Sequence, residues 1–361
     1  MTQAAALAAY GSNSPSNRNR IINGDMRIDQ RNAGASITPS NAQYALDRWR
    51  CYLSQASKYS VQQNAGSVTP PSGYTNYLGV TSLSAYSVGA IDIFGIQQFI
   101  EGFNVADLGW GSANAKAVTL SFKVYSSLTG TFGGVLQNDG QDRSYPFTYT
   151  ISSANTWTTI SVTVAGDTSG TWLTTNGRGL TVWFNLGAGS TVSGTAGAWA
   201  GSAFYSATGA TSVVGTSGAT FYITGVQLEE GSVATPFEHR QYGQELALCQ
   251  RYCYAQNKLV TNNYYAFGTA VATSSTTGQL GTPFPVSMRT NPSVTYSAAN
   301  LFFVDSAVSS NNAFTSINAD QVGNNYGYSN FTGGTSGTTG GGGRWLSNGA
   351  SAAYVIWSAE L

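Results

Sequence analysis

The run Ala117–Ser126 alternates apolar and polar side chains with a period of two. Every second position from Val118 to Val124 is apolar, and the positions between them carry hydroxyl, amine or phenol groups. This period matches a β-strand with one buried face and one wet face, and an α-helix would scatter the same residues around its axis. The run therefore predicts a half-buried strand.

Further strand-like runs lie between residues 21 and 240, and they are Phe147–Ser152, Trp157–Val164, Gly179–Leu186 and Phe221–Leu228. Turn pairs such as Asp139-Gly140 and Asn176-Gly177 lie between them. In the last run the apolar phase changes at Gly225, which predicts a β-bulge. Many short strands without intervening helices favour an antiparallel sandwich of the jelly-roll kind.

A helix is predicted over Gln241–Gln256, downstream of Pro236. Its apolar residues at spacings of 4, 3 and 4 are Tyr242, Leu246, Cys249 and Cys253. This is the spacing of a two-heptad seam, and Leu248 and Tyr252 form a second apolar stripe. A helix between copies of the chain and a helix lying across one sandwich both fit this pattern. Two heptads are too short to assemble alone, so an oligomer would need other contacts.

The segment 258–361 holds six charged residues and several strand-like runs, including Tyr264–Thr273, Ser293–Ser297, Leu301–Val304 and Ala353–Trp357. A free sheet so poor in charge risks edge-to-edge association, so this segment is expected to be a second β domain within an oligomer. The predicted class is all-β. The predicted parts are an arm at 1–20, a jelly-roll β-sandwich at 21–240, a linking helix at 241–257 and a C-terminal β domain at 258–361.

The chain carries 16 basic and 16 acidic residues, and charged residues are only 9% of its 361 positions. A nucleic-acid binder needs a basic face to neutralise phosphates, so no nucleic-acid partner is expected. The same balance disfavours polybasic anchoring to a membrane. No apolar run reaches 18 residues, so membrane insertion is not expected either.

Groups that could support catalysis or metal binding are few. His239 is the single histidine and follows no nucleophile elbow, and Glu229 and Glu230 are adjacent, so on a strand they point to opposite faces. Cys249 and Cys253 could bind a metal with His239, but burial as small apolar side chains is the favoured interpretation. The glycine run 333–343 lacks the following Lys-Ser/Thr of a phosphate loop. No catalytic residue, metal ligand or cofactor is predicted.

Three tryptophans, Trp110, Trp172 and Trp199, lie among Gly, Ser and Thr in apparent loops. Aromatic rings on loops of a rigid sandwich are able to stack on the apolar faces of sugars, so these three are candidate glycan-binding residues. The alternative for each is structural burial. Trp183 and Trp357 lie in strand-like runs and are expected in the core.

The segment Gly225–Arg251 reads GVQLEEGSVATPFEHRQYGQELALCQR. It resembles a recurrent stretch of bacteriophage tail-fibre and virion structural proteins, in which a GVQLE strand closes a jelly roll and ELALCQRYY starts a helix. Cys253 stands where that family has its second tyrosine. The start IINGDMRIDQRNAG, the LDRWR at 46–50 and the final WSAEL are also similar to that family.

This resemblance implies a virion protein and supplies no catalytic residues, so no enzymatic activity is predicted, and three functions are considered. The first is a homo-oligomeric, trimeric tail fibre or receptor-binding protein that recognises host-surface polysaccharide and attaches to other virion proteins through residues 1–20. The second is a structural decoration or adaptor protein without glycan binding. The third is a polysaccharide-degrading enzyme. Jelly rolls of this kind also hold structural Ca²⁺, for which the loop Asp139–Asp142 is the candidate.

Overall fold

The structure is a computed structural model that describes residues 18–258, 265–298, 302–305, 314–333, 342–347 and 353–361. These residues form two compact units. Unit one comprises residues 18–27, 36–43 and 49–240, and unit two comprises 28–35, 44–48 and the described residues from 241 to 361. Most of the predicted arm at 1–20, and most of the glycine run at 333–343, lie outside the described residues.

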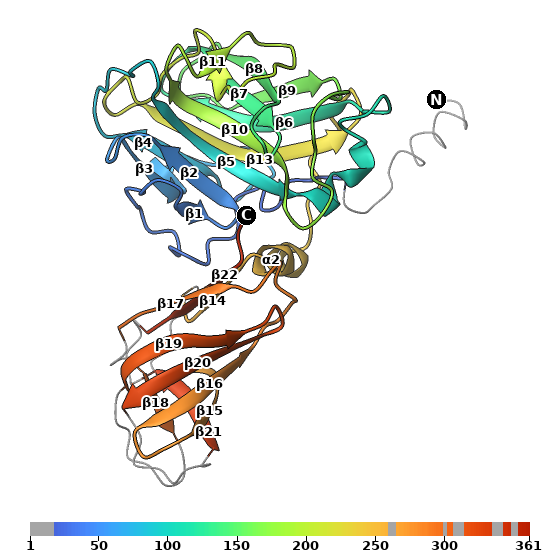
Figure 1. The fold of residues 1–361 in the computed structure, drawn as a ribbon. Helices are drawn as coiled ribbons and strands as arrows, with labels where there is room; N and C mark the ends of the chain where they lie inside the picture. The colour runs from blue at the N-terminus through green and yellow to red at the C-terminus, as the bar shows by residue number, and fades with distance from the viewer. Residues whose placement is uncertain (1–17, 259–264, 299–301, 306–313, 334–341, 348–352) are drawn as a thin grey trace. The chain divides into compact units, whose positions relative to one another are not determined.

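Unit one is built from two antiparallel sheets (Figure 1). The first sheet contains, in spatial order, β2 (Trp49–Leu53), β5 (Ile93–Glu101), β10 (Arg178–Ala188), β7 (Gly130–Gln137) and β8 (Ser144–Ile151). The second contains β3 (Tyr59–Gln63), β4 (Leu78–Ser82), β13 (Thr220–Glu230), β6 (Val118–Ser126) and β9 (Thr158–Val164). Shorter elements are η1 (Ala65–Ser67), η2 (Gly102–Asn104), η3 (Ala106–Leu108), β11 (Ser193–Gly194) and β12 (Ser206–Ala207).

Aromatic side chains from both sheets meet in the core of unit one. Phe122 of β6 packs edge-on against Phe184 of β10, with ring centroids 5.0 Å apart. Phe122 also lies 5.0 Å from Tyr149 of β8. These contacts join the inner faces of two sheets, which is the packing of a β-sandwich. The predicted all-β class is confirmed.

The period-two run predicted the strand β6 to within one residue. The bulge predicted at Gly225 is also present, because the register between β13 and β6 shifts between Thr224 and Gln227. Gly225 has a φ of 62°, and a Cβ there would lie 2.6 Å from the Tyr74 hydroxyl. The position therefore requires glycine for both its backbone and its space.

Unit two contains β1 (Tyr44–Leu46), the helix α2 (Tyr242–Gln250) and two sheets of the C-terminal segment. The smaller sheet contains β14 (Cys253–Gln256), β22 (Val355–Ser358) and β17 (Ser293–Tyr296) in this order. The larger contains β18 (Phe302–Asp305), β21 (Gly342–Ser347), β15 (Ala266–Ala272), β16 (Thr277–Pro283), β20 (Tyr326–Gly333) and β19 (Phe314–Val322). The core of unit two includes the fully buried rings of Trp345 and Trp357.

The predicted helix is wrong in its second half, because α2 ends at Gln250 and Cys253–Gln256 form β14. This strand pairs with β22, with Cys253 opposite Ser358 and Gln256 opposite Val355. Ladder bonds to a partner about a hundred residues away outweigh the local helical pattern. None of the helices in the described part of the chain has the length and apolar character needed to cross a bilayer.

A buried ionic network lies within unit two and joins its first and last segments. Arg48, whose side chain is 1% exposed, donates from Nη1 to Glu360 Oε2, and its guanidinium lies 3.6 Å from the ring centroid of Tyr252. Arg31 Nη2 donates to Glu360 Oε1 at 3.0 Å. Burial raises the pKa of the nearby Asp47 to about 7, although Arg31 favours its charged form. The Glu360 carboxylate is thus the acceptor that Arg48 and Arg31 share.

Replacing this shared carboxylate tests how strongly the two segments are tied. Glu360→Ala leaves Arg48 buried without its carboxylate, so we expect the free energy of unfolding to fall by about 3–5 kcal/mol. Glu230→Ala is the matched control because its pair with Lys116 is exposed, and it should change stability by less than about 1 kcal/mol. Urea denaturation of both variants measures the difference, and equal effects would contradict this role of Glu360.

Candidate functional site

The structure brings the three predicted glycan-binding tryptophans together. Trp110 follows η3, Trp172 precedes β10 and Trp199 precedes β12, and we call this group the tryptophan cluster. Their ring centroids lie 4.7 Å apart for Trp110–Trp172, 5.3 Å for Trp110–Trp199 and 5.4 Å for Trp172–Trp199. All three pairs meet edge to face, a favoured arrangement for aromatic rings. Each side chain is half-buried.

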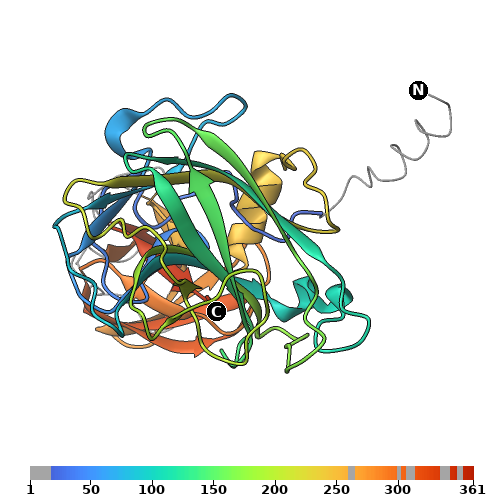
Figure 2. The same ribbon diagram turned by 90° about the horizontal axis from the view of Figure 1, so that it is seen from above.

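Two glycines let the loops approach closely enough to form the cluster. Gly111 N donates to Asp167 O at 2.7 Å, and a Cβ on Gly111 would lie 2.7 Å from Gly170 O. Both glycines have left-handed φ angles, 82° and 80°. In Figures 1 and 2 the teal segment with η2 and η3 lies next to the green loop that leads to β10, as its backbone hydrogen bonds require. Glycine at these positions thus places Trp110 against Trp172.

An ion pair fixes the loop that carries Trp172. Arg143 donates from Nε and Nη2 to the two carboxylate oxygens of Asp167, at 2.7 and 2.8 Å. Asp167 is 2% exposed and also accepts from Ser169 N at 3.0 Å. These hydrogen bonds to Asp167 raise the pKa of Arg143 above its ordinary value. A bidentate pair with one buried partner is both strong and directional, so it holds this loop in one position.

The indole N–H groups are all bonded to backbone carbonyls of unit one. Trp110 donates to Lys116 O at 2.7 Å, Trp172 to Ser169 O at 3.1 Å and Trp199 to Ala165 O at 2.7 Å. The rings are therefore held in place, and what they present to a ligand is their apolar surface. Such a cluster is able to stack against C–H groups, but its indoles have no donor left for a ligand.

Trp199 is tied to the edge of the first sheet. Its ring lies 5.3 Å from that of Tyr145 on β8, and Ser144 and Ala200 exchange backbone hydrogen bonds of 3.1 and 2.8 Å. Burial raises the pKa of Tyr145 above its ordinary value, so its hydroxyl stays protonated at neutral pH. This attachment connects the cluster to the rigid sandwich.

Polar side chains lie beside the cluster on the β7–β8 loop. Asn138 Nδ2 donates to Thr171 O at 3.1 Å, next to Trp172, and to Asp142 Oδ1 at 2.6 Å. Asp139 Oδ1 accepts from Arg178 Nε at 2.6 Å. The candidate Ca²⁺ loop thus uses its carboxylates in contacts within the chain, and no group of three metal-ligating His, Cys, Asp or Glu side chains is found among the described residues.

Sequence reasoning missed Arg143 and Asp167, which position the cluster. They lie in separate loops, and no spacing rule connects them. The available signal was indirect, since Gly111 and Gly170 each stand within two residues of a candidate tryptophan. Glycine beside a loop aromatic indicates a close backbone approach.

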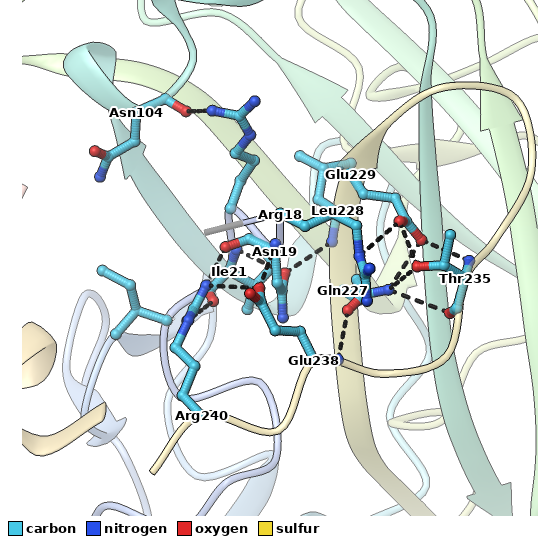
Figure 3. A network of polar contacts seen from close by, with 12 residues as sticks. Arg18, Asn19, Ile21, Asn104, Gln227, Leu228, Glu229, Thr235, Glu238 and Arg240 are labelled. Carbon is cyan, nitrogen blue, oxygen red and sulfur yellow. Dashed lines mark hydrogen bonds and ion pairs between the residues drawn. The ribbon is translucent and has the colours of Figure 1, made fainter. Parts of the chain in front are cut away.

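The segment that carries the family resemblance forms a polar clamp around the start of unit one (Figure 3). Asn19 bonds to β13 through Nδ2, which donates to Val226 O at 3.1 Å, and through Oδ1, which accepts from Leu228 N at 3.1 Å. Arg240 donates to the carbonyls of Asn19 and, at 3.0 Å, Ile21. The clamp therefore fixes where the chain enters the sandwich.

The same segment also organises the loop after β13 (Figure 3). Glu229 is buried and accepts from Thr235 N at 2.8 Å and Thr235 Oγ1 at 2.6 Å, while Gln227 Oε1 accepts from Glu238 N at 2.9 Å. The neighbouring Glu230 side chain is 44% exposed, against 1% for Glu229. The two adjacent carboxylates point to opposite sides of the strand, as the alternation predicts. The signature residues thus bind the chain to itself.

Three of the four predicted seam residues, Tyr242, Leu246 and Cys249, lie on α2, and the fourth does not. Tyr242 is 49% exposed and Leu246 is half-buried on α2, but Cys249 and Cys253 are fully buried, and Cys253 lies on β14. The predicted seam is therefore corrected by removing Cys253, and Cys249 remains on the helix but is buried within the chain. Burial raises the pKa values of both thiols well above their ordinary value. His239 packs against Tyr74 and Phe237, with centroids 5.4 and 4.9 Å apart.

No protein-family model and no curated protein sequence matches this chain. Its fold is similar to the enzymatically active domain of tailspike protein 4 of bacteriophage CBA120, with a TM-score of 0.34 and 12% identity over 60% of this chain and 22% of that one. The match thus spans about a fifth of the tailspike chain.

Carbohydrate-binding modules give comparable matches. TmCBM61, solved with β-1,4-galactotriose, has a TM-score of 0.30 and 9% identity over 59% of this chain and 99% of that one. The family 11 module of Clostridium thermocellum, solved with a mixed-linked tetrasaccharide, has a TM-score of 0.27 and 12% identity over 56% of this chain and 98% of that one. At such scores these likenesses carry no argument about binding.

Substituting Gly111 tests whether close loop approach builds the cluster. We expect Gly111→Ala to destabilise the protein by about 1–3 kcal/mol more than Gly209→Ala, because its Cβ meets the Gly170 carbonyl. Gly209 is the matched control, since its φ is 79° and nothing lies within 4 Å of its Cβ position. Urea denaturation and near-ultraviolet circular dichroism measure the effect. Equal stability and unchanged tryptophan signals in both variants would count against this role.

Proposed function

We propose that this chain is a fibre or receptor-binding protein of a phage virion, and that unit one binds host-surface glycan through the tryptophan cluster. The observation that carries the proposal is the convergence of Trp110, Trp172 and Trp199 from three loops into one rigid, half-exposed group. Aromatic surface held by a fixed scaffold costs little entropy to use in binding. The sequence resemblance to tail-fibre and virion proteins supports the location on a virion.

A binding role is favoured over polysaccharide cleavage. Glycoside hydrolysis needs two carboxyl groups facing each other about 5–9.5 Å apart. Beside the cluster, Asp167 is paired with Arg143 and Asp139 with Arg178, so these carboxylates are held in ion pairs. We therefore propose that the chain is not an enzyme.

One observation favours a second function, that of a structural adaptor without glycan binding. All three indole N–H groups are bonded within unit one, which is also how tryptophans fasten loops for purely structural reasons. The two functions differ in whether the unmodified chain binds a polysaccharide, and glycan binding at the cluster would depend on the rings.

Single substitutions of the cluster separate these two functions. We expect Trp110→Ala, Trp172→Ala and Trp199→Ala each to weaken binding to host-envelope polysaccharide about tenfold, which corresponds to about 1.4 kcal/mol. Tyr328→Ala is the control, because this tyrosine is exposed in unit two, outside the cluster. Affinity electrophoresis with purified polysaccharide measures the change. Absence of binding by the unmodified chain would support the adaptor function instead, and full binding in all three folded variants would place the glycan site outside the cluster.

The proposed fibre is a homotrimer that attaches to the particle through residues 1–20. The exposed Tyr242 of α2 and the charge-poor segment 258–361 are the parts of the chain proposed for association. We expect light scattering of the purified chain to give three times the 37.8 kDa protomer mass. A monomer at micromolar concentration would rule out a self-assembling fibre.

A further inference from the structure

We infer that the glycan bound at the tryptophan cluster is a neutral polysaccharide, without carboxylate, sulfate or phosphate groups. This inference rests on the proposed function and adds the chemical class of its ligand. It follows from the state of the charged side chains in the loops that carry or contact the cluster.

The basic residues of these loops are engaged in ion pairs. Arg143 directs Nε and Nη2 to Asp167, and Arg178 directs Nε to the Asp139 carboxylate and Nη2 to the Asp139 carbonyl. Lys116 Nζ lies 3.0 Å from Glu230 Oε2. Proteins bind anionic groups most strongly through arginine pairs of the same bidentate geometry. Here Arg143 already makes that geometry with Asp167, and Arg178 divides its donors between the carboxylate and the carbonyl of Asp139.

An anionic sugar would gain little by displacing Asp167. Asp167 is 2% exposed, so losing Arg143 would leave a buried carboxylate without its counter-charge. Breaking such a pair by removing one partner is destabilising, because it leaves an uncompensated buried charge. This cost cancels most of what a new arginine–anion pair would contribute.

The remaining charge beside the cluster is negative. Asp142 is exposed and accepts a hydrogen bond from Asn138, whereas Asp139 has its counter-charge in Arg178. A carboxylate or sulfate placed here would meet like charge, which disfavours association. A sugar hydroxyl instead donates to the Asp142 carboxylate, while the C–H face of its ring packs on an indole. Both features fit an uncharged sugar chain.

Affinity electrophoresis of the full chain tests this inference. The neutral probes are laminarin, galactan and arabinoxylan, and the acidic probes are polygalacturonate, alginate and hyaluronate. We expect binding to at least one neutral probe, about tenfold weaker in Trp172→Ala and unchanged in Tyr328→Ala. Because no ion pair forms with the ligand, raising NaCl from about 50 to about 500 mM should change this affinity less than twofold. No acidic probe should bind.

The two ways of failing are distinguishable. Binding of an acidic probe that salt weakens and Trp172→Ala abolishes would overturn the neutral class, and it would leave glycan binding at the cluster intact. Absence of binding to every neutral and acidic probe would overturn the proposed function and this inference together. Neutral binding that all three tryptophan variants retain would place the glycan elsewhere and overturn both.

Discussion

The bidentate pair between Arg143 and Asp167 is the interaction on which the arrangement of the tryptophan cluster depends. Arg143 directly precedes β8, and Asp167 lies in the loop between β9 and β10 that also carries Trp172. Through its backbone carbonyl, Asp167 also accepts from Gly111 and so reaches the loop of Trp110. A single buried residue, Asp167, thus connects three loops through its carboxylate and its backbone carbonyl. Loops without such ties are mobile and offer poor binding surfaces, because ordering them on binding costs free energy.

The same use of charge recurs through this chain, in which only 9% of residues are charged. Arg240 binds the carbonyls where the chain enters unit one, and within unit two Arg48 and Arg31 share Glu360. In each place an arginine joins segments that lie far apart in sequence. Arginine suits this role because its planar fork binds several acceptors at once. Few charges are left for the surface beside the cluster, and this is the physical basis for expecting an uncharged ligand.

The sequence predicted those parts of the fold that depend on neighbouring residues. A strand buried on one side has a period of two in its sequence. This period predicted both the buried face of β6 and, to within one residue, its bounds. The phase change at Gly225 marked a bulge because such a bulge needs glycine. The tryptophans were recognised by their small polar neighbours. The second half of the predicted helix was wrong, because β14 forms through its pairing with β22, which no local pattern records. The pair of Arg143 and Asp167 was not predicted for the same reason. Nor was the hydrogen bond between Asn19 and Val226, which are 207 residues apart.

The central claim is that the tryptophan cluster is where this protein meets a glycan. The most direct measurement is an experimental structure of the chain with an oligosaccharide of the tightest-binding polysaccharide. We expect a sugar ring packed on the exposed surface of Trp110, Trp172 or Trp199, with a hydroxyl donating to a carboxylate of the neighbouring β7–β8 loop. An oligosaccharide bound at another surface, with the cluster empty, would contradict the claim.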